Sequence, residues 1–308
     1  MGWLRPRALL AVLGYGALYA LALAHLAHRP GFDSGDSLVT LLVFGIGFSA
    51  IAWLVTRGAK APPAAVKRPA LEAFAILVYL AVFAVVVLGW LLSAVRGVAP
   101  REPLQSVAIL AVKLVTMVAL PAWVFAALGV SSRGLLAPRG FGLVEWRTFA
   151  VMGLLLLGLQ AVAGRGLKEI AALHVPAWHV ALFLLPAWAW LTIETGLCEE
   201  FLFRVLLQTR LAAALGSETA GLLAMALLFG LAHAPGYVLR GAHAMEGMTT
   251  APDPWTAAAY AIVVVSPLGL VFGVLWARTR NLALIALLHG LADLPPNLAP
   301  FIRAWTRH

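Results

Sequence analysis

Long apolar runs separated by short polar stretches dominate the chain. A helix that crosses a membrane needs about 20 predominantly apolar residues. One such run begins between residues 8 and 14 and ends at 27, and it is followed by runs at 38–56, 71–93, 106–129, 148–164, 179–213, 219–236, 257–277 and 282–300. The pattern predicts an all-α, polytopic membrane protein with eight or nine transmembrane helices.

The composition agrees with this interpretation. Hydrophobic residues make up 62% of the chain and charged residues 11%, whereas a soluble domain is about 45–50% apolar and about 25% charged. The 22 basic and 13 acidic residues give a net charge of +9, but most of them lie between apolar runs, where they set topology. We therefore expect a lipid bilayer and no nucleic acid as a partner. The single cysteine, Cys198, excludes an intramolecular disulfide and a zinc site built from cysteines.

The connecting segments differ in charge. Residues 57–68 carry four basic and no acidic side chains, and residues 133–147 carry three arginines, Arg133, Arg139 and Arg147. The positive-inside rule places the N-terminus and the loops at 57–68 and 130–147 in the cytoplasm. Arg5 and Arg7 precede the first run as in a signal peptide, but no small-residue cleavage site follows, so we expect an uncleaved first span. The Ala-, Leu- and Arg-rich composition favours a bacterial inner membrane.

Ionisable residues inside the apolar runs divide the chain in two. In residues 1–178, Glu72 and Lys113 lie near predicted helix ends, where such side chains can reach the interface. The second half concentrates ionisable groups in apolar context, which is costly and marks functional sites; these are Glu194, Glu199, Glu200, Arg204, His233, His289 and Asp293. We predict N-terminal transmembrane helices of unassigned role over 1–178 and a catalytic membrane domain over 179–300.

The first polar motif is Glu199-Glu200-x-x-x-Arg204. Residues four apart are neighbours on a helix, so Glu200 and Arg204 are predicted to pair. Glu199 lies about 100° further round the helix. One carboxylate is thus neutralised locally, while the other projects elsewhere without a local partner.

Two further motifs contain histidine. They are Phe229-x-x-x-His233 and His289-x-x-x-Asp293, and each is followed two residues later by a proline, Pro235 or Pro295. Each proline is expected to break its helix, and non-helical backbone at membrane depth survives only against protein or a watery cavity.

The spacing of the motifs indicates a single site. Glu199 and His233 lie 17 residues to either side of Gly216, in a predicted turn. Equal offsets in an antiparallel hairpin mean equal depth, so these two side chains can meet. His289 must then approach from a third helix.

In this order the three motifs resemble the CPBP family of intramembrane proteases, which includes type II CAAX prenyl endopeptidases and bacteriocin-processing and Abi-like members. The resemblance covers roughly residues 180–300. It implies hydrolysis of a peptide bond near the C-terminus or membrane anchor of a membrane-associated protein or peptide. The expected function is therefore that of an intramembrane endopeptidase of the glutamic type.

The resemblance also implies roles for individual residues. Glu199 would be the general base that activates water, assisted by His233. His289 and Asp293 would hold the developing oxyanion or orient the catalytic group. The remaining motif residues would support them; these are Glu200, Arg204 and Phe229. The family often has Asn at the position of Asp293, and Asn can donate a hydrogen bond that an ionised Asp cannot.

Two alternatives use the same side chains. Glu199, His233 and His289 could ligate zinc, as in a metalloprotease; the HExxH motif is absent, and we favour catalysis without a cofactor. A non-catalytic scaffold or a transporter could use Glu and His as an ion relay. Transport would be favoured by repeated halves with matched broken helices, and the sequence has no such repeat.

Overall fold

The computed structural model describes residues 6–99, 101–131, 135 and 139–306; Arg5 and Arg133 lie outside these ranges. This part of the chain contains nine helices long and apolar enough to cross a membrane. The prediction of an all-α, multi-pass integral membrane protein is thereby confirmed.

Short connections join the spans. Two of these connections contain a short helix, α10 (Gly166–Ala171) and η6 (Ala242–Ala244). Several spans contain wider, π-helical segments, η1–η5 and η7. In chain order the spans are α1 (Pro6–Ala27); α2 (Ser34–Thr40), η1 (Leu41–Phe48) and α3 (Ser49–Val55); α4 (Pro69–Val82), η2 (Phe83–Leu91) and α5 (Leu92–Val98); α6 (Leu104–Lys113), η3 (Leu114–Ala119) and α7 (Leu120–Ala127); α9 (Leu143–Ala163); α11 (Ala177–Leu191), η4 (Thr192–Leu197), α12 (Cys198–Glu200), η5 (Phe201–Gln208) and α13 (Thr209–Leu215); α14 (Glu218–Leu231) and α15 (Ala234–Arg240); α16 (Pro254–Tyr260), η7 (Ala261–Val265) and α17 (Ser266–Thr279); and α18 (Leu282–Thr306).

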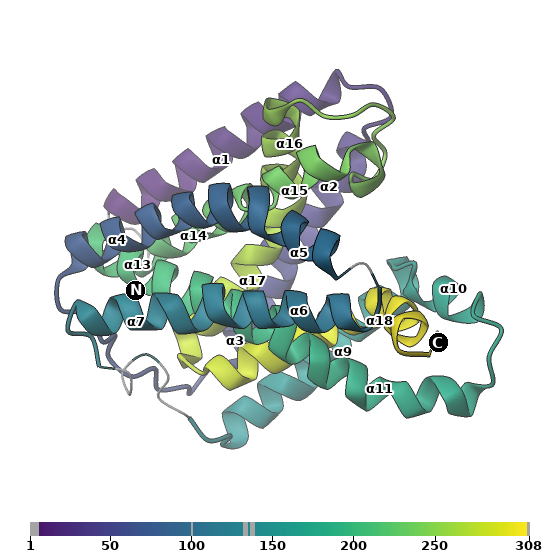
Figure 1. Cartoon of the computed structure of the whole chain (residues 1–308). Coiled ribbons are helices and arrows are strands. Elements are labelled where there is room, and N and C mark those ends of the chain that lie inside the picture. The colour runs from purple at the N-terminus through teal and green to yellow at the C-terminus, as the bar shows by residue number, and fades with distance from the viewer. Residues whose placement is uncertain (1–5, 100, 132–134, 136–138, 307–308) are drawn as a thin grey trace.

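The connections gather at two ends of the molecule. At one end, Arg139 Nη1 donates to the carbonyl oxygens of Lys60 and Thr279, at 3.1 and 2.8 Å. At the other end, Arg29 pairs with Asp253 at 3.1 Å, beside the adjacent helices α1 and α16 (Figure 1). Both loops predicted to be cytoplasmic, 57–68 and 130–147, therefore contribute residues to the first end.

The turn between α13 and α14 forms as predicted. Gly216 ends α13 in the left-handed region with φ +62°, which glycine adopts without strain. Ser217 caps α14, since its hydroxyl accepts from Ala220 N at 3.2 Å. The two spans therefore run antiparallel from this point.

The helix that carries His233 breaks where the sequence predicts. α14 ends at Leu231, and α15 begins at Ala234 with Pro235 in its first turn. His233 occupies the N-cap position of α15. Its side chain thus projects from an interruption in the span.

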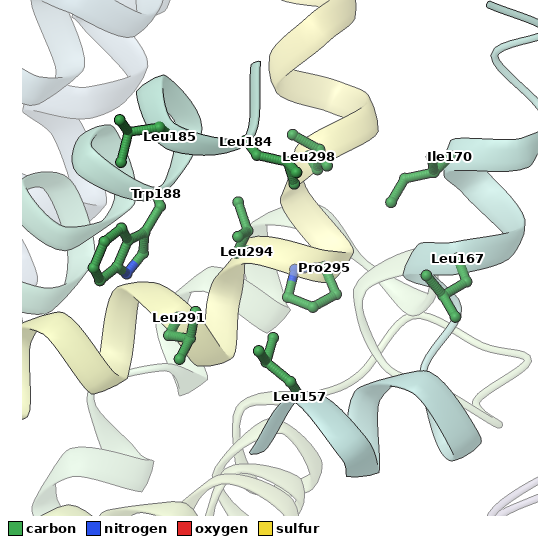
Figure 2. A pocket seen from close by; sticks show the side chains of 10 residues that line it. All are labelled: Leu157, Leu167, Ile170, Leu184, Leu185, Trp188, Leu291, Leu294, Pro295 and Leu298. Atoms are coloured by element: carbon green, nitrogen blue, oxygen red, sulfur yellow. The ribbon is translucent and has the colours of Figure 1, made fainter. Parts of the chain in front are cut away.

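The predicted break at Pro295 is wrong. α18 remains helical through Pro295 and Pro296, although it bends there (Figure 2). A proline cannot donate to the carbonyl four residues earlier, which for Pro296 is that of Ala292. The Gln160 side chain, from α9, donates to this carbonyl at 3.3 Å. The neighbouring helix therefore satisfies the exposed backbone group, and the helix continues.

Two glycines bring α18 against η4. A Cβ atom on Gly290 would collide with the backbone of Thr192, and one on Gly196 would collide with the backbone of Ala286. Small residues allow transmembrane helices to approach to backbone contact in this way. The crossing positions His289 next to the helix that carries both glutamates.

Candidate active site

A fully buried ion pair lies at the centre of the site. Arg204 Nη1 is 3.1 Å from Oε1 of Glu200, and both side chains are 0% exposed. The predicted pairing is therefore confirmed. The same Glu200 oxygen accepts a hydrogen bond from Nδ1 of His289 at 2.7 Å. Glu200 is thus occupied by a cation on its own helix and by a histidine from α18.

Phe229 connects this pair to the second histidine. The guanidinium carbon of Arg204 lies 4.3 Å from the centroid of the Phe229 ring and 5.7 Å from that of Phe272, and aromatic faces attract a desolvated cation. The backbone carbonyl of Phe229 accepts from Nδ1 of His233 at 2.8 Å. Because a carbonyl only accepts, Nδ1 carries the proton, and Nε2 of the neutral ring keeps a lone pair.

Glu199 faces a different environment from its neighbour. Its side chain is 18% exposed, and it lines a cavity of about 240 Å³ together with His233. Its Oε2 atom is 3.9 Å from Nε2 of His289. Of two adjacent glutamates, only Glu199 is presented to the cavity.

His289 and Asp293 lie beside Glu199. Nε2 of His289 is 3.7 Å from Oδ2 of Asp293 and 3.9 Å from Oε2 of Glu199. Both separations exceed that of a hydrogen bond, but they allow a charge interaction with the carboxylates when the His289 ring is protonated. Neither His289 nor Asp293 lines the cavity that Glu199 faces. Their position suits them to orient Glu199.

The opposite wall of the cavity comes from the first half of the chain. Three helical segments contribute to it, η2, α5 and η3, together with the last residue of α6. Their lining residues are Phe83, Val87, Leu88, Leu92, Arg96, Lys113 and Met117. At least part of the N-terminal half, for which the sequence indicates no role, therefore shapes the site.

The structure agrees only in part with the predicted places of Glu72 and Lys113: Glu72 lies in the first turn of α4, near a helix end, whereas Lys113 lies inside the span Leu104–Ala127. Lys113 Nζ is 2.9 Å from Oε1 of Glu194 and faces the cavity. Glu72 is 2% exposed and lies 3.3 Å from Nε of Arg210. Each side chain finds a partner of opposite charge on a helix distant in sequence, and this compensates for its burial. Lys113, Arg96 and Arg240 line the cavity and were not among the predicted site residues. For Lys113, the signal was its position inside a long apolar run.

A second, larger cavity has no connection with this chemistry. It has a volume of about 430 Å³ and adjoins the bend of α18 (Figure 2). Its lining is apolar throughout: Leu157, Leu167, Ile170, Leu184, Leu185, Trp188, Leu291, Leu294, Pro295 and Leu298. With no ionisable side chain, it cannot activate water.

The candidate ligands do not fit a zinc site in this arrangement. Among the described residues, no three His, Cys, Asp or Glu side chains are grouped to hold a metal ion. Zinc would require Glu199, His233 and His289 to converge tetrahedrally on one point.

The comparison with protein families adds independent support. Residues 178–295 match the family model described as Type II CAAX prenyl endopeptidase Rce1-like. This segment, called the Rce1-like segment below, is therefore similar to that family. The resemblance predicted from the three motifs is thereby confirmed, and the match supports an intramembrane protease. Neither the comparison with curated proteins nor that with solved structures gave a match.

The Rce1-like segment contains all three polar motifs but only part of the cavity. Glu199, His233 and the residues around them fall inside it, whereas the wall formed by η2, α5 and η3 precedes it. The cavity is therefore assembled from the Rce1-like segment and from helices outside it.

Proposed function

We propose that the protein is an intramembrane endopeptidase in which Glu199 activates the attacking water. The observation that carries this proposal is the different use of two adjacent glutamates. Glu200 is held by Arg204 and His289 in the interior, while Glu199 opens onto a cavity that His233 also lines. A general base has to reach both water and substrate, and Glu199 meets this condition.

In the proposed reaction, Glu199 takes a proton from water, and the resulting hydroxide attacks the carbonyl carbon of the scissile peptide bond. The lone pair on Nε2 of His233 accepts a hydrogen bond from the same water and helps to orient it. When the tetrahedral intermediate collapses, the carbon–nitrogen bond breaks. The protonated carboxyl of Glu199 then delivers its proton to the leaving amine.

The surrounding residues keep Glu199 in position. Glu200 accepts from Nδ1 of His289, which fixes the ring so that Nε2 faces Glu199 and Asp293. Arg204 neutralises Glu200 and is itself held by the Phe229 ring. We assign these residues to positioning. His289 lies next to the base, Asp293 and Glu200 contact His289, Arg204 contacts Glu200, and Phe229 contacts Arg204.

The proposed substrate is a membrane-associated protein or peptide, cleaved near its C-terminus or membrane anchor. Three features support this: the nine apolar helices of the described chain, the apolar cavity wall and the match to an Rce1-like family model. A largely apolar segment can enter such a cavity from the bilayer without desolvating many polar groups.

The proposal is tested by replacing the base. Glu199→Gln keeps the shape of the side chain, and we expect it to lower proteolysis by about 10²–10⁴-fold while the protein still purifies as one species. Glu102→Gln, on an exposed connection, is the matched control. Products are identified by comparing membrane proteomes of strains that carry each version. Wild-type cleavage by purified Glu199→Gln protein would refute the proposal.

A further inference from the structure

A groove runs between α1 and the hairpin formed by α13 and α14. Its volume is about 570 Å³. One wall is a single face of α1, made by residues three or four apart, which lie above one another on a helix; these are Arg7, Ala11, Gly14 and Leu18. The other wall comes from α13 and from α14, which packs beside α1 (Figure 1).

Small residues leave the space that forms this groove. A Cβ atom on Gly14 would meet no other atom within 4 Å, and α14 contributes Ala220 and Ala224 to the facing wall. Leu10 and Leu18, which also line the groove, are exposed. Lipid tails are as apolar as leucine side chains, so the exposed groove offers an acyl chain a matching surface within the bilayer.

Arg7 is the charged residue of the groove lining, and it lies in the first turn of α1. Its Nη1 donates to the carbonyl oxygen of Leu215 at 3.1 Å. In the described part of the chain Arg7 forms no ion pair, and the acidic residue at the start of α14, Glu218, is held by Arg280 at 2.6 Å. The exposed guanidinium of Arg7 therefore keeps an uncompensated positive charge at one end of an apolar groove.

The length of the groove matches one leaflet of a membrane. Arg7 and Leu18 are eleven residues apart on one helix, which is about 16 Å along its axis, and half of the hydrocarbon core is about 15 Å thick. Arg7 lies at the end predicted to be cytoplasmic, because Arg280, the partner of Glu218, follows Thr279 there. The cytoplasmic leaflet is the one that carries anionic lipids.

We propose that this groove binds one anionic phospholipid of the cytoplasmic leaflet, with its phosphate at Arg7 and an acyl chain along Gly14 and Ala224. A guanidinium group matches the geometry of a phosphate and binds it through paired, charge-assisted hydrogen bonds. The bound lipid holds α1 against the hairpin that carries Glu199 and His233. The site does not depend on the proposed peptidase activity, since none of its lining residues lines the catalytic cavity.

The charge at Arg7 is tested by the choice between two lipids. Native mass spectrometry counts the lipids bound to delipidated protein in a neutral detergent, with phosphatidylglycerol and phosphatidylcholine of identical acyl chains. One arginine near a membrane surface favours an anionic lipid by about fivefold, and we expect this preference for the first phosphatidylglycerol. Arg7→Gln should remove the preference. Arg57→Gln, an exposed position outside the groove, should keep it.

Two glycines of α1 test the apolar part of the site. Gly14→Leu should fill the groove and weaken the binding of both lipids by about tenfold, because displacing about two methylene groups from a buried position has this effect. Gly16→Leu is the matched control, since Gly16 is equally open but does not line the groove. It should bind both lipids as the wild type does.

Several results would overturn the lipid site. They are equal binding of the two lipids to the wild type, a preference that survives in Arg7→Gln, a preference that Arg57→Gln also removes, and unchanged binding by Gly14→Leu. Release of phosphatidylglycerol by an equal concentration of inorganic phosphate would assign Arg7 to a free anion instead.

Discussion

Nδ1 of His289 lies 2.7 Å from Oε1 of Glu200, and this contact joins α18 to the helix that carries both glutamates. It forms where Gly196 and Gly290 allow the two helices to approach to backbone distance. Glu200, which appears equivalent to Glu199 in the sequence, is therefore hydrogen-bonded to His289. The contact explains why two adjacent carboxylates can have different tasks.

Loss of the buried cation should unfold the site. Arg204→Ala leaves Glu200 without its cation in an interior position with 0% exposure, and we expect a destabilisation of about 3–5 kcal/mol. Thermal unfolding in detergent measures the effect, with Arg101→Ala as the exposed control. An Arg204→Ala protein with wild-type yield and melting temperature would contradict the pairing argument.

The wall from the N-terminal half should be necessary for activity. Val87 is 7% exposed and lines the cavity, whereas Val85, on the same helix, is 73% exposed. Val87→Trp should fill the cavity and lower kcat/KM by about tenfold or more, because even a displacement of about 1 Å can cost 10²-fold in rate. Val85→Trp should have little effect. Equal activities of two well-folded variants would show that substrate does not use this cavity.

Asp293 offers a test of charge against hydrogen bonding. Its Oδ2 is 3.7 Å from Nε2 of His289, which is too far for a hydrogen bond. Replacement by Asn therefore breaks no hydrogen bond at this position. We expect Asp293→Asn to keep substantial activity and Asp293→Ala to lose more, by about 100–1000-fold if Asp293 acts as a transition-state donor. If Asp293 works as a protonated donor, the wild type should lose activity at high pH through a limb that the Asn variant lacks. An Asn variant as inactive as the Ala variant at every pH would contradict a donor role.

Metal removal separates the glutamic mechanism from the zinc alternative. We expect purified protein to contain no stoichiometric zinc and to keep its activity after treatment with strong chelators, since in the proposed mechanism Glu199 carries the proton and His233 orients the water. Elemental analysis and activity on the same preparation measure this. One tightly held zinc per chain, with activity lost on its removal and restored on its return, would establish the metalloprotease alternative.

The sequence by itself determined the features that depend on neighbouring residues. Apolar runs define helices long enough to cross a bilayer, and four-residue spacing pairs Glu200 with Arg204. The turn at Gly216 follows from the permissive backbone of glycine and a capping serine. These properties arise within one helix or one turn, so local periodicity is sufficient to predict them.

Only the tertiary structure decided how the helices meet. Lys113 pairs with Glu194, 81 residues away. Gln160 donates a hydrogen bond to the Ala292 carbonyl, 132 residues further along the chain, which Pro296 leaves free in α18. The cavity wall around Val87 also belongs to no motif. Such contacts depend on where helices cross, which small residues and complementary side-chain shapes determine. Hydrophobic periodicity shows that a helix has an apolar surface, but it does not specify which helix will pack there.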